Sequence, residues 1–493
     1  MKIASPKIHT SQQTANEQAL LRCQTALEQK DKEDLEGAQE TMRPLWRGIG
    51  FRPEANELHV SVRAEVLFCA GVLTGWIGSR NQVKDAQETA KNLLTESITY
   101  FESVGDVTKV AAARTEIAFC YWRDGEINEA RIILHEALKR LTTEGNTRAA
   151  ALLKLTTVEC SAARYHEALA ILNGNMVLFQ KLTNHTTKGS YHTELAIILR
   201  NLATSEKRDE YFLTAISEFE RADREFKLAR NIVFRAAVKN NVGLLLCKLA
   251  RFKEAHRYLD EARRLTATFK DKARIAQIDE SSAQVFIAEG KLKEAEAVAR
   301  RAASALERGG HYCMMAEALI TQGIALARSL RRERAQFIFQ QAVQTALRVD
   351  ARNTAGLATL TMIEEIDHLS PATLQAAYQK AREWLSTTQS QEVKLRLADA
   401  AGKVTASVPG ELSSDEATEM LLSKPGDLQE RMLKYEGALI KQALSEANGR
   451  VTHAASLLGI NYQGLCYIIE SRHKDLLKER SPVRRRTRRS YTK

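Results

Sequence analysis

The chain has 493 residues, of which 44% are hydrophobic and 27% are charged, a composition typical of proteins that bury a core and a length sufficient for several domains or one elongated array. The N-terminal stretch MKIASPKIHTSQQTANEQ lacks the apolar core of a secretory signal, and no apolar run approaches the ~18 residues that cross a bilayer. The seven cysteines are scattered without a CxxC pair, which favours small buried side chains in a reducing compartment over disulfides or a metal site. We therefore expect a cytoplasmic protein with no membrane segment and no bound metal.

The net charge of +11 is concentrated near the C-terminus. Ten Lys and Arg residues lie between Arg472 and Lys493, against two acidic residues, so the preceding part of the chain is close to neutral. A basic tail over residues 481–493 favours a partner rich in phosphate. The alternative is a disordered tail that only improves solubility.

Residues 1–14 are expected to form a flexible arm, and residues 15–402 an array of helices. No proline lies between Glu54 and Ser370, and apolar residues recur at i, i+3 and i+4 throughout this region, which predicts helices. Self-comparison shows a period of 40 residues, marked by a recurring alanine: Ala215, Ala255, Ala295 and Ala335.

A second alanine follows each recurring alanine seven residues later, and a small residue precedes it by twelve positions. In three of the four copies, a Phe or Leu lies between the two alanines. Small residues let paired helices approach closely, and we expect the bulky residue to fill the groove of the next repeat. Weaker copies centre on Ala168 and Ala86. Over roughly residues 60 to 350 the pattern resembles the tetratricopeptide repeat, although the period is 40 instead of about 34 and the proline between repeats is absent. The resemblance implies stacked antiparallel helix pairs with a concave groove for a peptide or protein partner.

Two asparagines stand at equivalent places in successive repeats, fourteen residues before the recurring alanines: Asn201 and Asn241. The resemblance implies that asparagines here hold a peptide backbone, since a carboxamide is both donor and acceptor. Further candidates on the same inferred face are Arg200, Lys207, Asn240 and Lys248. The alternative is that polar residues recur by chance on a solvated face.

The array is expected to close with a helix that Ser370 caps and Pro371 begins, and that continues through Trp384. Residues 403–427 contain two prolines and several serines, which predicts a linker with at most a short helix.

Residues 428–480 predict a compact set of three helices. The first spans Leu428 to Ala447 and stops at Asn448-Gly449. The second, His453 to Leu458, is very short and is capped by Thr452. Gly459 supplies a left-handed turn, Ile460 plugs the junction and Asn461 caps the third helix, whose Leu465 and Ile469 pack back against Ala455 and Leu458.

A short helix, a glycine turn and a following helix form the helix-turn-helix pattern, and the stretch NGRVTHAASLLGINYQGL with the long helix before it resembles the Fis-type domain of bacterial activators. The resemblance implies duplex DNA as partner, a homodimer formed through the first helix, and a third helix in the major groove. Gln463 suits a bidentate contact to adenine. The candidate DNA contacts are Thr452, Asn461, Tyr462, Gln463, Cys466, Tyr467 and Arg472. Family members usually carry Arg or Lys where this chain has Tyr462, Tyr467 and Ile468, so we expect phosphate contacts from the tail residues Arg484, Arg485, Arg486, Arg488 and Arg489.

The sequence contains no P-loop, HExxH or GxSxG motif, so we expect neither catalysis nor a cofactor. The favoured hypothesis is a DNA-binding transcriptional regulator whose array senses a peptide or protein, located in the cytoplasm and on the nucleoid when bound to DNA. The alternative is a scaffold or chaperone-like protein whose tail binds nucleic acid without sequence preference. A further helical hairpin at 449–469 is disfavoured, because His453 to Leu458 is too short for an array helix.

Overall fold

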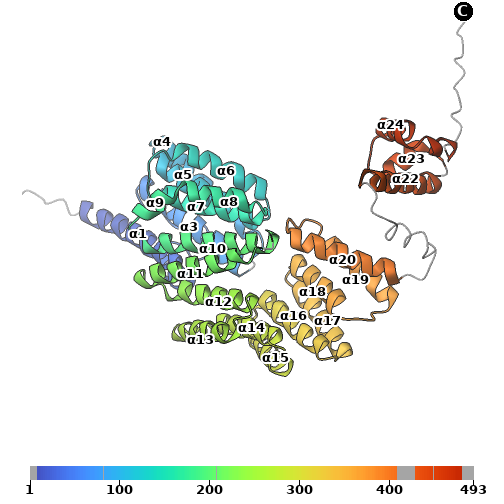
Figure 1. Cartoon of the computed structure of the whole chain (residues 1–493). Coiled ribbons are helices and arrows are strands. Elements are labelled where there is room, and N and C mark those ends of the chain that lie inside the picture. The colour runs from blue at the N-terminus through green and yellow to red at the C-terminus, as the bar shows by residue number, and fades with distance from the viewer. Residues whose placement is uncertain (1–7, 82, 207, 408–427, 448, 480–493) are drawn as a thin grey trace, which may run out of the picture. The chain divides into compact units, whose positions relative to one another are not determined.

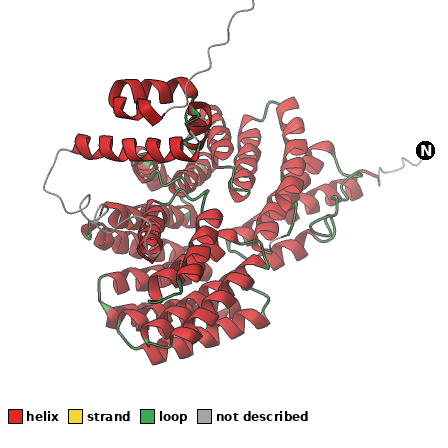
Figure 2. Ribbon diagram, turned by 90° about the vertical axis from the view of Figure 1, so that its right-hand side faces the viewer, coloured by secondary structure: helices red, strands yellow, loops and turns green. Residues whose placement is uncertain are grey.

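The computed structural model describes residues 8–81, 83–206, 208–407, 428–447 and 449–479. Within these ranges the regular structure is helical and no strand occurs (Figure 2), which confirms the predicted all-α class. The chain divides into two compact units, Met1–Val408 and Pro409–Lys493.

The larger unit begins with a hairpin of two helices and continues as helix pairs in chain order (Figure 1). Its helices are α1 (Ile8–Asp31), α2 (Leu35–Met42), α3 (Val60–Arg80), α4 (Ala86–Ser103), α5 (Val107–Arg123), α6 (Ile127–Arg140), α7 (Asn146–Ser161), α8 (Tyr165–Gly174), α9 (Met176–Lys181), α10 (His185–Glu206), α11 (Glu210–Leu228), α12 (Ile232–Lys248), α13 (Phe252–Thr268), α14 (Lys272–Ala288), α15 (Leu292–Arg308), α16 (Tyr312–Arg328), α17 (Arg332–Leu347), α18 (Arg352–Glu365), α19 (Pro371–Trp384) and α20 (Gln391–Ser407). We call α3, α5, α7, α10, α12, α14, α16 and α18 the first helices of their pairs.

The 40-residue period is confirmed by the helix starts, because α12, α14, α16 and α18 begin at residues 232, 272, 312 and 352. The bulky residue packs toward the next repeat as expected, since Leu259 shares a core with Ile278 and Val285 of α14, and Phe339 shares one with Leu360 and Ile363 of α18. A Cβ placed on Gly323 would lie 2.8 Å from the ring of Phe339, and one on Gly243 would lie 2.8 Å from Leu259. Phe339 and Leu259 therefore also pack into the glycine gap on the first helix of their own pair, which sets how closely those two helices approach.

The upstream copy assigned to Ala86 is shifted by four residues. In α4 the buried residues Ala90 and Leu94 take the places of the first alanine and the bulky residue, and Leu94 lies against Gly71 of α3. The loop between α3 and α4 is longer than in the regular repeats. The longer loop shifts the repeat positions along the sequence, while a leucine still packs against a glycine of the first helix.

The turns between helices repeat every 20 residues, each with one residue of positive φ: Arg230, Ala250, Lys270, Gly290, Gly310, Leu330 and Asp350. Around Leu330 the amide of Arg331 donates to the carbonyl of Leu326 at 3.0 Å, the hydrogen bond that closes a helix with a left-handed residue. Five of the seven positions carry a side chain, although this conformation costs a residue with Cβ about 1–2 kcal/mol.

Replacing Leu330 with glycine is expected to stabilise the array by about 1 kcal/mol, because φ is +61° and the side chain is 78% exposed, so strain is relieved and little packing is removed. The measurement is the denaturant midpoint of the full chain. The matched control is Gly290→Ala at the equivalent turn, where φ is +79° and no atom would lie within 4 Å of the new Cβ. This control should destabilise by a similar amount, and a decrease of stability in Leu330→Gly would contradict the strain argument.

Helix α3 is long and apolar enough to cross a membrane by length and composition alone. In the structure 67% of its apolar window is buried, among residues of α1, α2, α4 and α5. Its apolar character is thus explained by neighbours on several sides.

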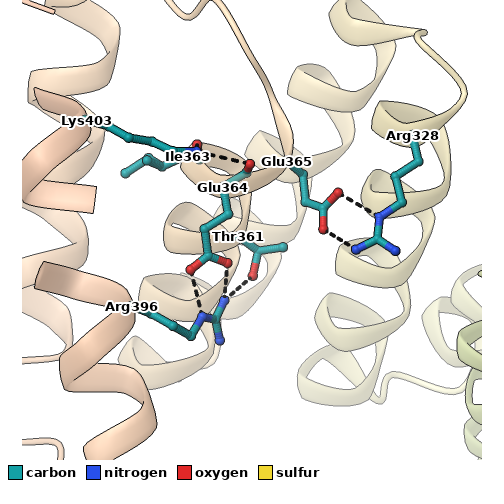
Figure 3. Close-up of polar contacts among 7 residues, drawn as sticks. All are labelled: Arg328, Thr361, Ile363, Glu364, Glu365, Arg396 and Lys403. Carbon is teal, nitrogen blue, oxygen red and sulfur yellow. Dashed lines mark hydrogen bonds and ion pairs between the residues drawn. The ribbon is translucent and has the colours of Figure 1, made fainter. Parts of the chain in front are cut away.

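The last helices extend past the expected end of the array at residue 402, since α20 continues to Ser407. Figure 3 shows the contacts that hold α20 against the end of α18. Arg396 makes a two-pronged ion pair with Glu364, at 2.8 and 2.7 Å, and Lys403 donates to the carbonyl of Ile363 at 3.1 Å. Lys403 therefore satisfies a free carbonyl at the C-terminus of α18, a long-range contact that a linker assignment from composition does not consider. At the other end α1 begins at Ile8, within the stretch expected to be a flexible arm.

Candidate nucleic-acid interface

The smaller unit contains α22 (Leu428–Glu446), α23 (Val451–Leu457), α24 (Tyr462–Arg472) and a short 3₁₀ helix, η1 (Lys474–Glu479). As predicted, Leu465 and Ile469 of α24 are fully buried and share one core with Ala455, with Leu458 packed against it. The remaining core residues come from α22, the residue after it, α23 and η1: Ile440, Ala443, Leu444, Ala447, Val451, Ala454 and Leu476. The three helices thus hold one another around a small apolar centre.

The turn between α23 and α24 forms at Gly459, whose φ is +68°. The amide of Ile460 donates to the carbonyl of Ala455 at 3.0 Å, so the left-handed glycine closes α23 as expected. Ile460 itself is 39% exposed and does not plug the junction. The space between the helices is already filled by Leu465 and Ile469.

One of the two helix caps predicted for this unit is confirmed and the other is wrong. Asn461 caps α24, and its side chain accepts a hydrogen bond from the amide of Gly464 at 2.6 Å. Thr452 does not cap α23, because that helix already begins at Val451 and its cap position is Arg450. Thr452 is instead an exposed residue of the first turn. The predicted stop at Asn448-Gly449 is described only at Gly449, whose φ is +72°, because residue 448 lies outside the described residues.

Helix α24 presents a mainly uncharged outer face. Tyr462, Gln463 and Tyr467 are exposed, Tyr467 to 68%, and Cys466 is partly buried. Beside them, Arg450, just before α23, and His453 of α23 are also exposed. These two were not among the predicted contacts, although basic residues at the start of the second helix are a signal visible in the sequence.

Arg472 is engaged in an ion pair inside the unit. Its guanidinium lies 3.1 Å from Glu436 of α22, and the buried His473 lies 3.0 Å from the same carboxylate. Glu436 therefore ties the end of α24 to α22, a long-range role that the sequence did not indicate. The predicted contacts of the tail, from Arg484 to Arg489, lie outside the described residues. The sequence from 428 to 479 carries seven Lys and Arg against six Asp and Glu, so this part of the unit is nearly neutral.

The candidate groove residues of the array lie on two first helices. Arg200 and Asn201 are partly buried near the end of α10, and the guanidinium donates to the Asn201 carboxamide at 3.4 Å. Asn240 and Asn241 are partly buried in α12, and the Oδ1 atom of Asn240 is buried without a hydrogen-bond partner among the described residues. Such an oxygen is costly unless a donor reaches it. Lys248 is the last residue of α12, and residue 207 lies outside the described part.

A titrating carboxyl on α10 was not predicted. Burial raises the pKa of Glu194 to about 7, although Thr157 donates a hydrogen bond to it at 3.1 Å and Arg200 lies close enough to oppose the shift. No sequence motif distinguishes Glu194, because its environment comes from another helix pair.

Stability is expected to fall with rising pH because of Glu194. Below about pH 4.5 the carboxyl is protonated in both states. Between that value and about 7 the unfolded chain loses its proton first, so the free energy of unfolding decreases, by about 3 kcal/mol in total. Glu194→Gln should remove this part of the pH dependence, measured by denaturant unfolding from pH 4.5 to 8. The control is Glu144→Gln, an exposed carboxylate on the loop before α7, and equal pH profiles for wild type and Glu194→Gln would contradict the assignment.

Comparison with known proteins supports the class of the smaller unit. Residues 434–467 match the family model described as bacterial regulatory protein, Fis family. The match covers most of α22, all of α23 and the first half of α24. The unit is thus a Fis-type helix-turn-helix, a class of DNA-binding domain. No curated protein sequence matches the chain.

Several solved structures are similar to the chain. A Rap protein complexed with competence and sporulation factor has 11% identity and a TM-score of 0.45, over 69% of this chain and 99% of that chain. Aspartyl phosphate phosphatase F from Bacillus subtilis has 11% identity and a TM-score of 0.46, over 80% and 95%. A signal transduction ATPase with a tetratricopeptide repeat sensor from Pyrococcus horikoshii has 14% identity and a TM-score of 0.47, over 67% and 52%.

Proposed function

We propose that the protein is a transcriptional regulator that binds operator DNA through the Fis-type unit and responds to a peptide or protein bound by its helical array. The observation that carries the proposal is the helix-turn-helix itself, in which α24 is held by a complete core while Tyr462, Gln463 and Tyr467 remain exposed. The domain organisation we propose keeps the DNA-binding domain at 428–480 and the basic tail at 481–493. It moves the start of the array from 15 to 8 and its end from 402 to 407, where α1 begins and α20 ends, so that the arm is 1–7 and the linker 408–427.

In this proposal Gln463 reads a base edge, and the tyrosines contact phosphate or the methyl group of thymine. Arg450 and His453 add phosphate contacts from the start of α23, and the tail arginines Arg484, Arg485, Arg486, Arg488 and Arg489 add further charge. Asn461 acts through its cap bond, and Arg472 through its pair with Glu436. The protein acts as a homodimer formed through α22, on which Leu433 and Leu439 remain exposed. It is located in the cytoplasm and associates with the nucleoid when bound to DNA.

The test begins with selection of genomic fragments that bind the full chain. Gln463→Ala combined with Tyr467→Ala should weaken binding to selected fragments by at least tenfold, while the exposed α22 residue Ser445→Ala serves as the matched control. Removal of residues 481–493 should lower the slope of log affinity against log salt by about 0.9 for each phosphate that the tail neutralises in the wild-type complex. Failure to enrich any fragment would favour the scaffold with a nonspecific tail. Sedimentation of the chain with and without DNA tests the dimer.

For the array, the proposed partner site uses Arg200, Asn201, Asn240, Asn241, Lys207 and Lys248. The buried Oδ1 of Asn240 supports it, because a peptide amide placed there would supply the missing donor. Asn201→Ala with Asn241→Ala should leave thermal unfolding and DNA binding intact and abolish the response of DNA binding to a cell extract that contains the partner. A large drop in melting temperature would show that these asparagines are structural.

A further inference from the structure

The turn between α1 and α2 lies against helices about 200 positions or more further along the chain. The carbonyl of Asp31 accepts a hydrogen bond from the Nδ2 atom of Asn231 at 3.2 Å, just before α12. The carboxylate of Glu33 lies 2.5 Å from the guanidinium of Arg274 in α14. The N-terminal hairpin thus bridges from α3, against which α1 packs, to the starts of two first helices in the middle of the array.

The two array side chains that make these contacts are buried or partly buried. Asn231 is only 1% exposed, and its carboxamide oxygen accepts the amide of Phe234 and so caps α12, while its nitrogen holds the turn. The guanidinium of Arg274 is 25% exposed and is flanked by Asp271 at 3.6 Å. Departure of the turn would leave the Asn231 nitrogen without this acceptor and uncover the arginine.

The turn itself is held in one conformation. Glu33 has a φ of +59°, and the amide of Asp34 donates to the carbonyl of Gln29 at 2.9 Å, which closes α1. The side chain of Asp34 then caps α2 by accepting the amide of Gly37 at 2.9 Å. A turn closed from both sides presents Asp31 and Glu33 at little further cost in conformational entropy.

The end of α1 also covers an aromatic and charged surface on α3 and α5. The Lys30 ammonium lies 5.2 Å from the ring centre of Trp76, and the guanidinium of Arg123 lies 4.5 Å from the same ring. Glu116 lies nearby: burial raises its pKa, but Lys154, Lys30 and Arg123 outweigh this effect and hold the pKa at about 2. Lys30 therefore belongs to a charge cluster that loses one cation if α1 leaves.

We propose that α1 and the turn Asp31–Asp34 form a releasable clasp that covers the first helices α3 and α5 and fastens on α12 and α14. In the structure the chain's own α1 covers this surface of α3 and α5. A partner that binds the same surface must first displace α1. The role of the partner rests on the proposed function, whereas the clasp is a property of the array alone. Opening at the turn breaks one ion pair and one hydrogen bond. Departure of α1 also uncovers Ala19, Cys23 and Ala26, which share a core with α3, so the closed form is strongly favoured and opening is a rare event.

Two buried thiols report on the clasp. Cys23 of α1 and Cys69 of α3 are 5% and 0% exposed where these helices meet, and the Cys69 thiol points to the Cys23 carbonyl at 3.7 Å. Alkylation with N-ethylmaleimide, followed peptide by peptide with mass spectrometry, measures how often α1 leaves α3. The exposed Cys313 of α16 is the internal standard.

Arg274→Glu should speed alkylation of Cys23 and Cys69 in the full chain by about tenfold, the factor that corresponds to 1.4 kcal/mol. The double variant Glu33→Arg with Arg274→Glu should restore much of the slow rate, because the ion pair is kept with its charges exchanged, although the new carboxylate at position 274 lies beside Asp271. The matched control is Arg263→Glu, which breaks an ion pair with Asp279 between α13 and α14 and should leave both rates unchanged.

Equal rates in wild type and Arg274→Glu would overturn the clasp, and so would acceleration in Arg263→Glu as large as in Arg274→Glu, since that result would mean general loosening. Failure of the double variant to restore the rate would also contradict the ion pair as fastener. The DNA affinity of the same variants is measured in parallel. Absence of DNA binding in wild type would refute the proposed function while leaving the alkylation result intact.

Discussion

Phe339→Ala is expected to destabilise the array by about 3–5 kcal/mol, the range for removal of a fully buried phenylalanine. The ring is 0% exposed and fills the gap left by Gly323 on α16, so its removal leaves a cavity between two helices whose distance is set by that glycine. The surrounding alanines Ala335 and Ala342 are too small to fill the space.

The matched control is Phe337→Ala, two residues earlier in α17, where the ring is 65% exposed. This change should alter stability by no more than about 0.5 kcal/mol. Because repeat arrays unfold in parts, the measurement is hydrogen exchange of α16 and α17 together with denaturant unfolding. Similar effects for the two variants would mean that the glycine gap does not determine the pairing.

Leu465→Ala is expected to unfold the Fis-type unit and abolish DNA binding. The side chain is fully buried at the meeting point of the three helices, and a buried Leu→Ala change costs about 2–5 kcal/mol. A core this small leaves little stability in reserve. The array should be unaffected, since it forms a separate compact unit.

Leu457→Ala at the end of α23 is the control, because that leucine is 49% exposed. Circular dichroism of residues 428–493 and DNA binding of the full chain measure the two effects. Retention of DNA affinity in Leu465→Ala would show that α24 is not the element that binds DNA, or that the core does not hold it.

The sequence by itself determined the all-α class, the 40-residue spacing and the helix-turn-helix. These features depend on local patterns: the recurrence of Ala335 and its equivalents, the left-handed conformation at Gly459 and the cap at Asn461 are encoded within a few residues. They follow from steric and capping preferences that act over one helix turn. Each could therefore be predicted before the packing of the chain was known.

Tertiary structure alone decided where the long-range contacts fall. The packing of Phe339 against its own partner helix, the attachment of α20 by Lys403, the ion pair of Arg472 with Glu436 and the clasp from Glu33 to Arg274 each join residues from different elements. Composition placed Lys403 in a linker, and the resemblance to Fis-type domains placed Arg472 on DNA, because neither could show the carbonyl or carboxylate that each side chain meets. The burial that raises the pKa of Glu194 arises in the same way, since the electric environment of a side chain depends on neighbours that only the folded chain brings within a few ångströms.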